Sequence, residues 1–308
     1  MRASANIFLL CLLLLMESCN KQDTCEQSDI FIDGNKRGRK VLIIGIDGFR
    51  SDAMQQHISP FLYNLSQLSD TYYNDAHQVE KLTFSGPNWT SILTGVHIQK
   101  HQVGTNELGY HKLHEYPHFF NYIELADSRL NTVSLSSWII INERIVSGNA
   151  DYAKTYKYAD EDVYLAALQI LREQIPIVPD VMFVSFHELD GAGHDYGFSA
   201  NQPEYVNTLS RIDAYINDVV SVIEAKRQAG EDWLLIVVSD HGGDNKSHKG
   251  GYGNVNIRNT IFYANHPMLT FNHSHRSAQV DVVPTVLDYL GIVSLGFNCK
   301  TDGVSLIK

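Results

Sequence analysis

Three short segments of the sequence contain aspartate and histidine in patterns that could bind metal ions. One aspartate ends an apolar run, an Asp-Gly-Ala-Gly-His segment sets its two ligands four residues apart, and an adjacent Asp-His pair precedes another histidine by seven residues. The six side chains are Asp47, Asp190, His194, Asp240, His241 and His248. Mixed carboxylate and imidazole ligation suits Zn²⁺, with Mn²⁺ or Fe as alternatives. Six ligands would serve two divalent ions of three ligands each and leave open positions for a nucleophile and a substrate oxygen.

Each segment taken alone has a simpler interpretation, because Asp, His and Gly are common in turns. Asp47 and Gly48, for example, could form a turn and nothing more. Three such segments, each after an apolar run of strand length, are harder to explain as coincidence. We therefore predict a metal site.

A hydroxyl-rich segment between the first two clusters offers candidate nucleophiles. Ser85 precedes a Gly-Pro pair at a predicted helix start, where backbone N–H groups and the helix dipole favour an anion. A serine becomes a strong nucleophile when a metal ion stabilises its alkoxide. The competing interpretation is that Ser85 only caps the helix. Residue types alone do not separate it from Thr83, Thr90 or Ser91.

The elements that must position these clusters alternate between strand and helix patterns. Apolar runs rich in β-branched residues predict strands at Val41–Ile46, Val133–Ser137, Val181–Phe186, Leu234–Val238 and Thr260–Ala264. Helical patterns lie between them at Pro60–Leu68, Asp160–Glu173, Glu204–Lys226 and Val280–Tyr289. This alternation predicts an α/β fold, with a doubly wound, mostly parallel central sheet and helices on both faces. Ligand sites in such sheets lie beyond the carboxyl ends of the strands, where the metal-binding patterns occur.

Composition and net charge exclude several classes of protein and of binding partner. The 308 residues are 44% hydrophobic and 19% charged, which excludes a disordered chain and a bundle of membrane spans. The net charge of −11 argues against binding to a nucleic-acid duplex, because such affinity comes from basic residues that neutralise phosphates. An anionic substrate would therefore need a local source of positive charge, which bound metal ions supply.

The N-terminal segment predicts export. Arg2 precedes an apolar run from Ile7 to Met16, about half the length that a membrane-spanning helix needs. We expect residues 1–19 to be a signal peptide and the mature protein to be extracytoplasmic, either periplasmic, secreted or held at the cell surface by a lipid on Cys19. Residues 20–39 would form an N-terminal extension and residues 40–308 a single catalytic domain. Cys25 and Cys299 could then pair in an oxidising compartment or stay separate thiols, and their spacing does not decide between the two.

Taken together, the segments resemble the alkaline phosphatase superfamily, and most closely its type I phosphodiesterase/nucleotide pyrophosphatase branch. The matching segments run from Val41 to Gly291 in the family's order. Asp47-Gly-Phe-Arg is similar to the family's first metal motif, and residues 280–291 resemble its C-terminal packing helix. The family nucleophile stands two residues before a proline that corresponds to Pro87, so the resemblance selects Ser85.

The resemblance implies two metal-ion sites and a covalent mechanism. Its two ligand sets would be Asp190, His194 and His248, and Asp47, Asp240 and His241 with Ser85 Oγ. Asn106 matches an asparagine that helps to hold a phosphoryl oxygen. The implied activity is hydrolysis of a small phosphate ester by an exported enzyme that forms a phosphoseryl intermediate.

Two departures from the family pattern leave the substrate class open. The branch with nucleotide substrates usually has threonine where this chain has Ser85, and Gln102 replaces a common glycine. A phosphomonoesterase, a phosphonate-ester hydrolase and a homologue that binds metal without catalysis are the alternatives. A sulfatase is disfavoured because its pattern requires arginine where this chain has Trp89.

Two further expectations concern glycines and histidines near these segments. Gly191 and Gly193 should permit the turn that brings Asp190 and His194 to one ion, so Gly193→Val should weaken metal loading. A second series of histidines is expected to be structural or solvated rather than another metal site. The series is His97, His101, His111, His114 and His118.

Overall fold

The computed structural model describes residues 30–293 and 300–308 of the chain. The predicted signal peptide, Cys19, Cys25 and Cys299 lie outside these residues, and the division of the chain at residues 19 and 39 stays a prediction. Among the helices of the described residues, none is both long and apolar enough to cross a membrane.

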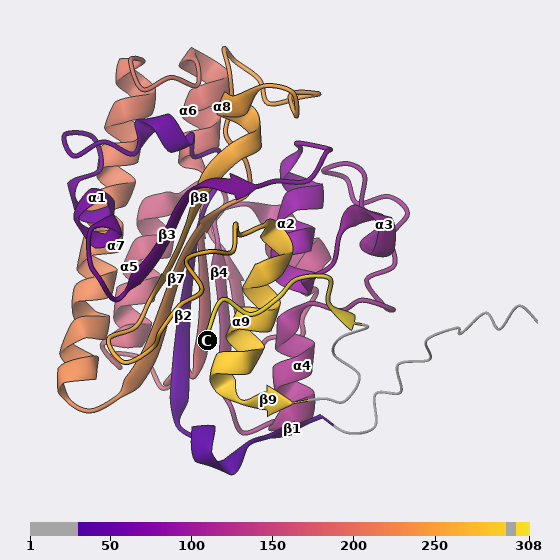
Figure 1. The fold of residues 1–308 in the computed structure, drawn as a ribbon, viewed down its shortest axis with the longest axis vertical. Coiled ribbons are helices and arrows are strands. Elements are labelled where there is room, and N and C mark those ends of the chain that lie inside the picture. Colours follow the sequence, from indigo (N-terminus) through magenta and orange to yellow (C-terminus); the bar gives the residue numbers. More distant parts are fainter. Residues whose placement is uncertain (1–29, 294–299) are drawn as a thin grey trace, which may run out of the picture.

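Seven strands of the described residues form one central sheet (Figure 1). Their order is β3 (Thr71–Gln78), β8 (Asn259–Asn265), β7 (Asp232–Ser239), β2 (Arg39–Ile46), β6 (Val181–Phe186), β4 (Thr132–Ser136) and β5 (Tyr152–Thr155). The strands from β7 to β5 pair in parallel, whereas β8 is antiparallel to both of its neighbours. The structure confirms the mostly parallel sheet and each of the five predicted strands.

Strands β3 and β5 were not predicted, and both lie at edges of the sheet. Strand β3 has the mixed sequence TYYNDAHQ, and β5 has only four residues, each at least partly exposed. Neither therefore shows the continuous apolar run of a central strand. A separate antiparallel pair joins β1 (Phe31–Ile32) to β9 (Ile292–Val293).

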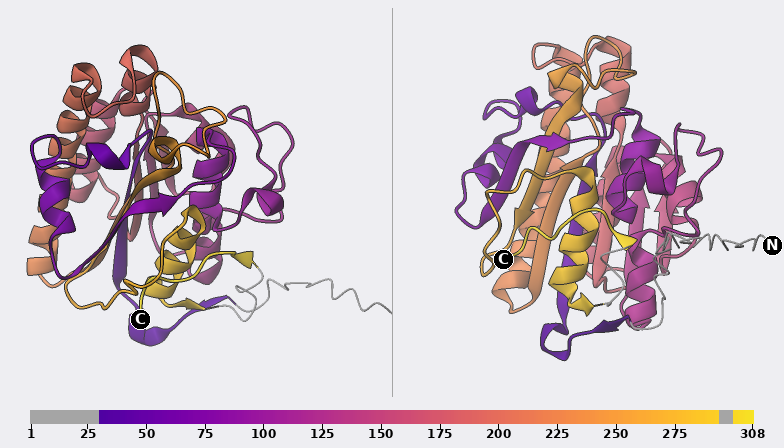
Figure 2. Two further views of the ribbon diagram at one scale, coloured as in Figure 1. Left: turned by 45° about the horizontal axis from the view of Figure 1, so that its top comes forward. Right: turned by 45° about the vertical axis from the view of Figure 1, so that its right-hand side comes forward.

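Helices cover both faces of the sheet, as Figures 1 and 2 show. Helices α1 (Pro60–Ser66), α5 (Asp160–Leu171), α6 (Glu188–Tyr196) and α7 (Pro203–Gln228) contribute to the core on one face. Helices α2 (Ser85–Thr94), α4 (Phe119–Ala126) and α9 (Val282–Leu290) contribute to the core on the other. Alternate side chains of β2, such as Ile43 and Ile44, enter opposite cores and are fully buried. This arrangement confirms the doubly wound α/β architecture.

Shorter elements complete the chain. They are α3 (Ile98–His101), α8 (Val255–Arg258), the 3₁₀ turns Gly34–Lys36, Ser51–Ala53 and Gln279–Asp281, and a π-helical turn at Ile141–Val146. The helix predicted at Val280–Tyr289 divides into the last of these 3₁₀ turns and α9.

The register of three central strands determines where the functional side chains meet. Ile46 at the end of β2 pairs with Phe186 at the end of β6 and with Ser239 at the end of β7. The residues that immediately follow these strands therefore emerge side by side at the carboxyl edge of the sheet, where ligand sites of such folds lie.

Candidate metal centre

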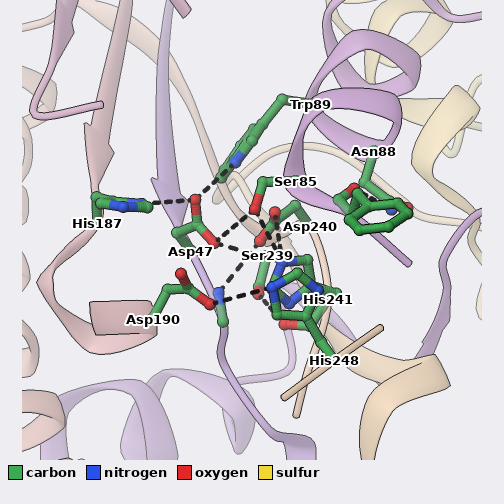
Figure 3. A network of polar contacts seen from close by, with 12 residues as sticks. Asp47, Ser85, Asn88, Trp89, His187, Asp190, Ser239, Asp240, His241 and His248 are labelled. Carbon is green, nitrogen blue, oxygen red and sulfur yellow. Dashed lines mark hydrogen bonds and ion pairs between the residues drawn. The ribbon is translucent and has the colours of Figure 1, made fainter. Parts of the chain in front are cut away.

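The residues predicted to bind metal lie together at this edge of the sheet, and Figure 3 shows them with the exception of His194. Asp47 follows β2, Asp240 and His241 follow β7, Asp190 and His194 lie in α6, and His248 lies in the loop after β7. Ser85 is the first residue of α2, and its side chain faces the cluster. Within the described residues, every group of three side chains close enough to hold a metal ion lies at this edge.

The polar atoms form two adjacent groups. In the first, His241 Nε2 lies 3.0 Å from Ser85 Oγ, 3.2 Å from Asp240 Oδ2 and 3.5 Å from Asp47 Oδ1. In the second, His194 Nε2 lies 3.5 Å from Asp190 Oδ2 and 3.1 Å from His248 Nε2. The imidazoles of His241 and His248 stack with ring centroids 3.8 Å apart and connect the groups. Asp47, Asp240 and His241 lie close enough to share one ion, whereas the third side chain close enough to share an ion with Asp190 and His248 is His241 rather than His194.

Backbone carbonyls orient the three imidazoles. The Nδ1 atoms of His194, His241 and His248 lie 3.0, 2.8 and 2.6 Å from the carbonyl oxygens of Lys246, Gly242 and Thr83. A carbonyl oxygen only accepts a hydrogen bond, so each Nδ1 carries the proton and each Nε2 presents a lone pair to the cluster. The Nε2 atoms of His194 and His248 thus face each other with lone pairs, an arrangement that a shared cation would stabilise.

The carboxylates of the cluster lack sufficient donors. Among the described residues, Asp190 Oδ1 and Asp240 Oδ2 are buried and have no hydrogen-bond partner. Burial, together with the neighbouring Asp47 carboxylate, raises the pKa of Asp190 and of Asp240 well above the ordinary value. Burial lowers the pKa of His241 and of His248, which favours neutral imidazoles with ligand lone pairs. The donor set therefore fits divalent cations, and the geometry offers them two adjacent groups.

A tight turn after β2 brings Asp47 next to α6. Gly48 has φ +76°, and a Cβ atom on it would lie 2.9 Å from Asp190 Cα, so this position requires glycine for both conformation and space. The Tyr205 hydroxyl donates to the Gly48 carbonyl at 2.7 Å and accepts from Arg50 N at 3.0 Å. The first metal motif is thus held by a side chain from α7.

Asp190 and His194 lie one turn apart in helix α6, in which neither Gly191 nor Gly193 has positive φ. Glycine is needed at 193 for space, because a Cβ there would lie 2.3 Å from the Phe198 ring, whereas nothing lies within 4 Å of a Cβ at 191. No contact therefore requires glycine at 191. The Asp160 carboxylate begins the helix by accepting from the backbone N–H groups of His187 and Glu188 at 2.9 and 3.0 Å.

The candidate hydroxyls have different environments. Thr83 donates to the His248 carbonyl, Thr90 donates to the Gly86 carbonyl at 2.7 Å, and Ser91 donates to Glu80 at 2.8 Å. Of these four hydroxyls, Ser85 is the one whose oxygen lies beside His241 and Asp47.

Asn106 contacts the start of α2. Its Oδ1 accepts from the Gly86 N–H at 2.8 Å, and Pro87 has no N–H, so the first turn of the helix has fewer free backbone donors than expected. Because Oδ1 is occupied, the Asn106 amide turns its NH₂ group away from Gly86.

Two residues at the site were not predicted as functional. His187 Nδ1 and Trp89 Nε1 lie 2.8 and 3.1 Å from Asp47 Oδ2. His187 follows β6 directly, just as Asp47 follows β2, and this position at a strand end is the signal that could have identified it. Trp89 lies one turn of α2 beyond Ser85, where only the folded geometry reveals its partner.

The second histidine series is spread over other parts of the molecule. His97 Nδ1 lies 2.8 Å from Glu80 Oε1, and buried His101 lies 3.0 Å from Ser91 Oγ. His118 is buried beside Phe120, while the side chain of His114 is 75% exposed. We call the seven residues that could bind metal the metal-binding cluster; they are Asp47, Ser85, Asp190, His194, Asp240, His241 and His248. None of the contacts of the second histidine series involves this cluster.

Comparison with known proteins agrees with this architecture. Residues 41–149 and 127–263 match the family model for type I phosphodiesterase / nucleotide pyrophosphatase. The human bis(5'-adenosyl)-triphosphatase ENPP4 is 23% identical over 223 residues, which cover 66% of this chain and 47% of that protein. The bovine form is 22% identical over 227 residues with the same coverage, so the chain spans about half the length of the curated relatives it matches.

Solved structures share the fold at low sequence identity. Murine ectonucleotide pyrophosphatase/phosphodiesterase 5 superimposes with a TM-score of 0.62 at 15% identity, covering 88% of this chain and 100% of that chain. A 2-O GAG sulfatase superimposes with a TM-score of 0.68 at 12% identity, covering 87% of this chain and 73% of that chain. These likenesses establish an alkaline-phosphatase-like fold.

Proposed function

The chain belongs to the type I phosphodiesterase/nucleotide pyrophosphatase family, and from this premise we propose that it is an exported, metal-dependent phosphodiesterase/nucleotide pyrophosphatase with Ser85 as its nucleophile. The observation that carries the proposal is the position of Ser85 Oγ, 3.0 Å from His241 Nε2 and 3.5 Å from Asp47 Oδ1 at the start of α2. A hydroxyl beside buried carboxylates and oriented imidazoles is placed for activation by a cation.

Two groups of side chains would hold two divalent cations, which we expect to be Zn²⁺, with Mn²⁺ or Fe as alternatives. The groups are Asp47, Asp240 and His241 with Ser85 Oγ, and Asp190, His194 and His248. Bound cations supply positive charge that stabilises a serine alkoxide and the charged oxygens of a phosphoryl group. In a chain with net charge −11, this charge also offsets the repulsion between an anionic substrate and the protein.

The residues of the chain divide the remaining work. Ser85 Oγ releases its proton to solvent and forms a bond to phosphorus while the bond from phosphorus to the leaving oxygen breaks, and the leaving oxygen takes up a proton from water. The Asn106 NH₂ group donates to a phosphoryl oxygen, and its orientation follows from the bond between its Oδ1 and the Gly86 N–H. Water then attacks the phosphoserine, which restores the Ser85 hydroxyl and releases a phosphate monoester.

The names of the relatives support a small nucleotide substrate. The human and bovine ENPP4 proteins are bis(5'-adenosyl)-triphosphatases, and an inactive variant of murine ENPP5 has been solved with AMP. We propose a substrate of the same chemical class, in which phosphorus carries two ester or anhydride linkages. A relative described as an ectonucleotide pyrophosphatase also supports an extracytoplasmic location, with residues 1–19 as signal peptide and Cys19 as the site of a lipid if the chain is anchored.

The proposal is tested with metal-loaded mature protein assayed on bis-p-nitrophenyl phosphate and p-nitrophenyl phosphate. We expect a preference for the diester, and a loss of activity of at least about 10³-fold in Ser85→Ala. Ser91→Ala, which changes another buried serine of α2, is the matched control and should retain activity. A monoester preference that still depends on Ser85 would overturn the diesterase assignment and favour a phosphatase. Inactivity on both substrates with two bound ions would favour a homologue that binds metal without catalysis.

A further inference from the structure

The two carboxylate oxygens of Asp47 have different surroundings (Figure 3). Oδ2 lies 2.8 Å from His187 Nδ1 and 3.1 Å from Trp89 Nε1. Oδ1 lies 3.5 Å from Ser85 Oγ and 3.5 Å from His241 Nε2. Oδ2 thus contacts two side chains outside the proposed ligand set, whereas Oδ1 lies beside the candidate nucleophile.

Both contacts to Oδ2 are hydrogen bonds that the neighbours donate. An indole nitrogen can only donate, and an imidazole nitrogen at 2.8 Å from a carboxylate oxygen carries its proton. Two donors occupy the lone pairs of Oδ2, so Oδ1 is left to bind a cation. This use of Nδ1 distinguishes His187 from His194, His241 and His248, whose Nδ1 atoms donate to backbone carbonyls.

The His187 ring is held in place from several elements. Trp138 stacks on it with ring centroids 5.7 Å apart and an angle of 14° between the planes, and Tyr158 lies on it at 5.6 Å. Its backbone N–H donates to Asp160 Oδ1 at 2.9 Å. Tyr158 adopts φ +52°, a left-handed conformation that is uncommon for a residue other than glycine. The imidazole therefore has a defined orientation toward Asp47.

We propose that His187 is a positioning residue for the metal-binding carboxylate of Asp47. By donating to Oδ2 beside Trp89, it makes Asp47 a ligand through Oδ1 alone and directs that oxygen toward Ser85. The inference rests on the proposed two-cation site and concerns one of its two groups. Asp47, His187 and Asp190 also lie close enough to one another to hold an ion directly, with His187 as a ligand. Ligation through Nδ1 would require His187 to lose the proton that it donates to Asp47.

Two substitutions separate these roles. His187→Leu removes the donor, whereas His187→Asn places an amide NH₂ near the position of Nδ1 and restores it. We would measure zinc affinity by competition with a chromophoric chelator, and would follow the absorption spectrum of the Co²⁺-loaded protein. His187→Leu should weaken the binding of one of two ions by about 10–100-fold, as loss of an outer hydrogen bond to a metal ligand does. His187→Asn should bind both ions within about threefold of wild type.

His97→Leu is the matched control, because His97 Nδ1 makes a contact of the same length, 2.8 Å, with Glu80 outside the metal-binding cluster. It should leave both affinities and the Co²⁺ spectrum unchanged. Thermal unfolding with chelator present shows whether each variant is folded, and the restored affinity of His187→Asn excludes a general packing effect.

Three results would overturn the inference. Unchanged affinity in His187→Leu would show that the donor is unnecessary. Equal weakening in both variants, with a changed Co²⁺ spectrum, would identify His187 as a ligand. A wild-type chain that binds no divalent ion would overturn this inference together with the proposed two-cation site. A chain that binds two ions without esterase activity would overturn the proposed activity alone, since the affinity measurements do not depend on turnover.

Discussion

Helix α2 contains two buried serines that each contact a histidine and lie beside a carboxylate. Ser85 Oγ lies 3.0 Å from His241 Nε2 and 3.5 Å from Asp47 Oδ1. Ser91 Oγ lies 3.0 Å from His101 Nε2 and 2.8 Å from Glu80 Oε1. Each cluster combines a serine, a histidine and a carboxylate, yet the hydrogen bond between serine and histidine runs in opposite directions in the two.

The cluster around Ser91 is internally satisfied. His101 Nδ1 accepts from the Val103 N–H at 3.0 Å, so its Nε2 carries the proton and donates to Ser91, which in turn donates to Glu80. Burial lowers the pKa of His101 to about 4, which keeps the ring neutral. His101 therefore cannot take a proton from Ser91, and the cluster joins α2, α3 and the segment after β3.

At Ser85 the polarity is reversed. His241 Nδ1 donates to the Gly242 carbonyl, which turns the Nε2 lone pair toward Ser85 and two carboxylates. In the same cluster, among the described residues, Asp240 Oδ2 is buried without a partner. A candidate metal site therefore differs from a structural network in having buried lone pairs that no hydrogen-bond donor satisfies.

The largest test of this difference neutralises one carboxylate in each cluster. Asp240→Asn should lower turnover by at least about 10³-fold, because it removes a proposed ligand. In the presence of chelator it should raise the unfolding temperature, since the pKa of Asp240 is raised by burial and by Asp47, so its charged form destabilises the metal-free fold. Glu80→Gln should retain turnover and cost about 1–3 kcal/mol of stability, because it disturbs bonds from Ser91 and His97.

Activity assays and thermal unfolding of both variants decide this prediction. The conservative amide keeps an Oδ1 acceptor for the Gly48 N–H, which lies 3.2 Å from Asp240 Oδ1. Destabilisation of the chelated protein by Asp240→Asn would mean that the two clusters do not differ in the way proposed.

Metal binding should stabilise the cluster around Ser85 and should not affect the cluster around Ser91. Adding Zn²⁺ to chelator-treated protein at about 100 times its Kd should raise the unfolding temperature by about 5–10 °C. Ser91→Ala should lower the starting temperature and keep this rise, whereas His248→Ala should lose much of it. An equal loss in both variants, measured by differential scanning calorimetry, would contradict the assignment of His248 to the metal site.

Substitutions of Gly193 and Gly191 in α6 should differ in their effects on metal loading and on stability. Gly193→Val should weaken metal loading and cost about 1–3 kcal/mol, because a Cβ at 193 meets the Phe198 ring, whose centroid lies 5.2 Å from that of His194. Gly191→Ala should be neutral or stabilising, since a Cβ there meets nothing within 4 Å and alanine favours a helix. Metal analysis and urea unfolding measure both effects. Unchanged loading in Gly193→Val would show that Phe198 moves without disturbing His194.

The same comparison explains what could be predicted from sequence. Central strands such as β2 and β7 were predictable because both faces of the sheet are covered and the runs are continuously apolar. Their ends identified Asp47 and Asp240, since the carboxyl ends of parallel strands share one edge. Edge strand β3 was not predictable in this way, because its sequence TYYNDAHQ is mostly polar and contains no continuous apolar run.

The direction of the hydrogen bonds could not be predicted from the sequence. Ser85 and Ser91 have the same type and lie on the same helix, and the tautomers of His241 and His101 distinguish them only after folding. The role of His187 depends on which atom meets Asp47, which residue spacing does not specify.

The smallest expected effect is a pH dependence in the structural cluster. The hydrogen bond that His97 Nδ1 donates to the Glu80 carboxylate raises the pKa of His97, with the charge of Asp302 adding to the effect. A histidine whose pKa is higher in the folded state stabilises the fold below its unfolded pKa of about 6.5, and loses this contribution as pH rises through the folded value. His97→Gln should therefore lower the unfolding temperature more at pH 5.5 than at pH 8.5. Because the His97 side chain is 45% exposed, the difference should be at most about 1 kcal/mol.

The difference between wild type and variant isolates His97 from most other titrating groups. His101 has the opposite sign, because burial lowers its pKa to about 4 and its contribution disappears as pH falls. The carboxylates near Ser85 are present in both chains and cancel in the difference, whereas removal of the His97 charge also removes its lowering effect on the pKa of His101. A difference that grew from pH 5.5 to pH 8.5 would show that His97 contributes as a neutral ring. The hydrogen bond from Ser91 would then be the interaction that holds the Glu80 carboxylate, without a charged His97 beside it.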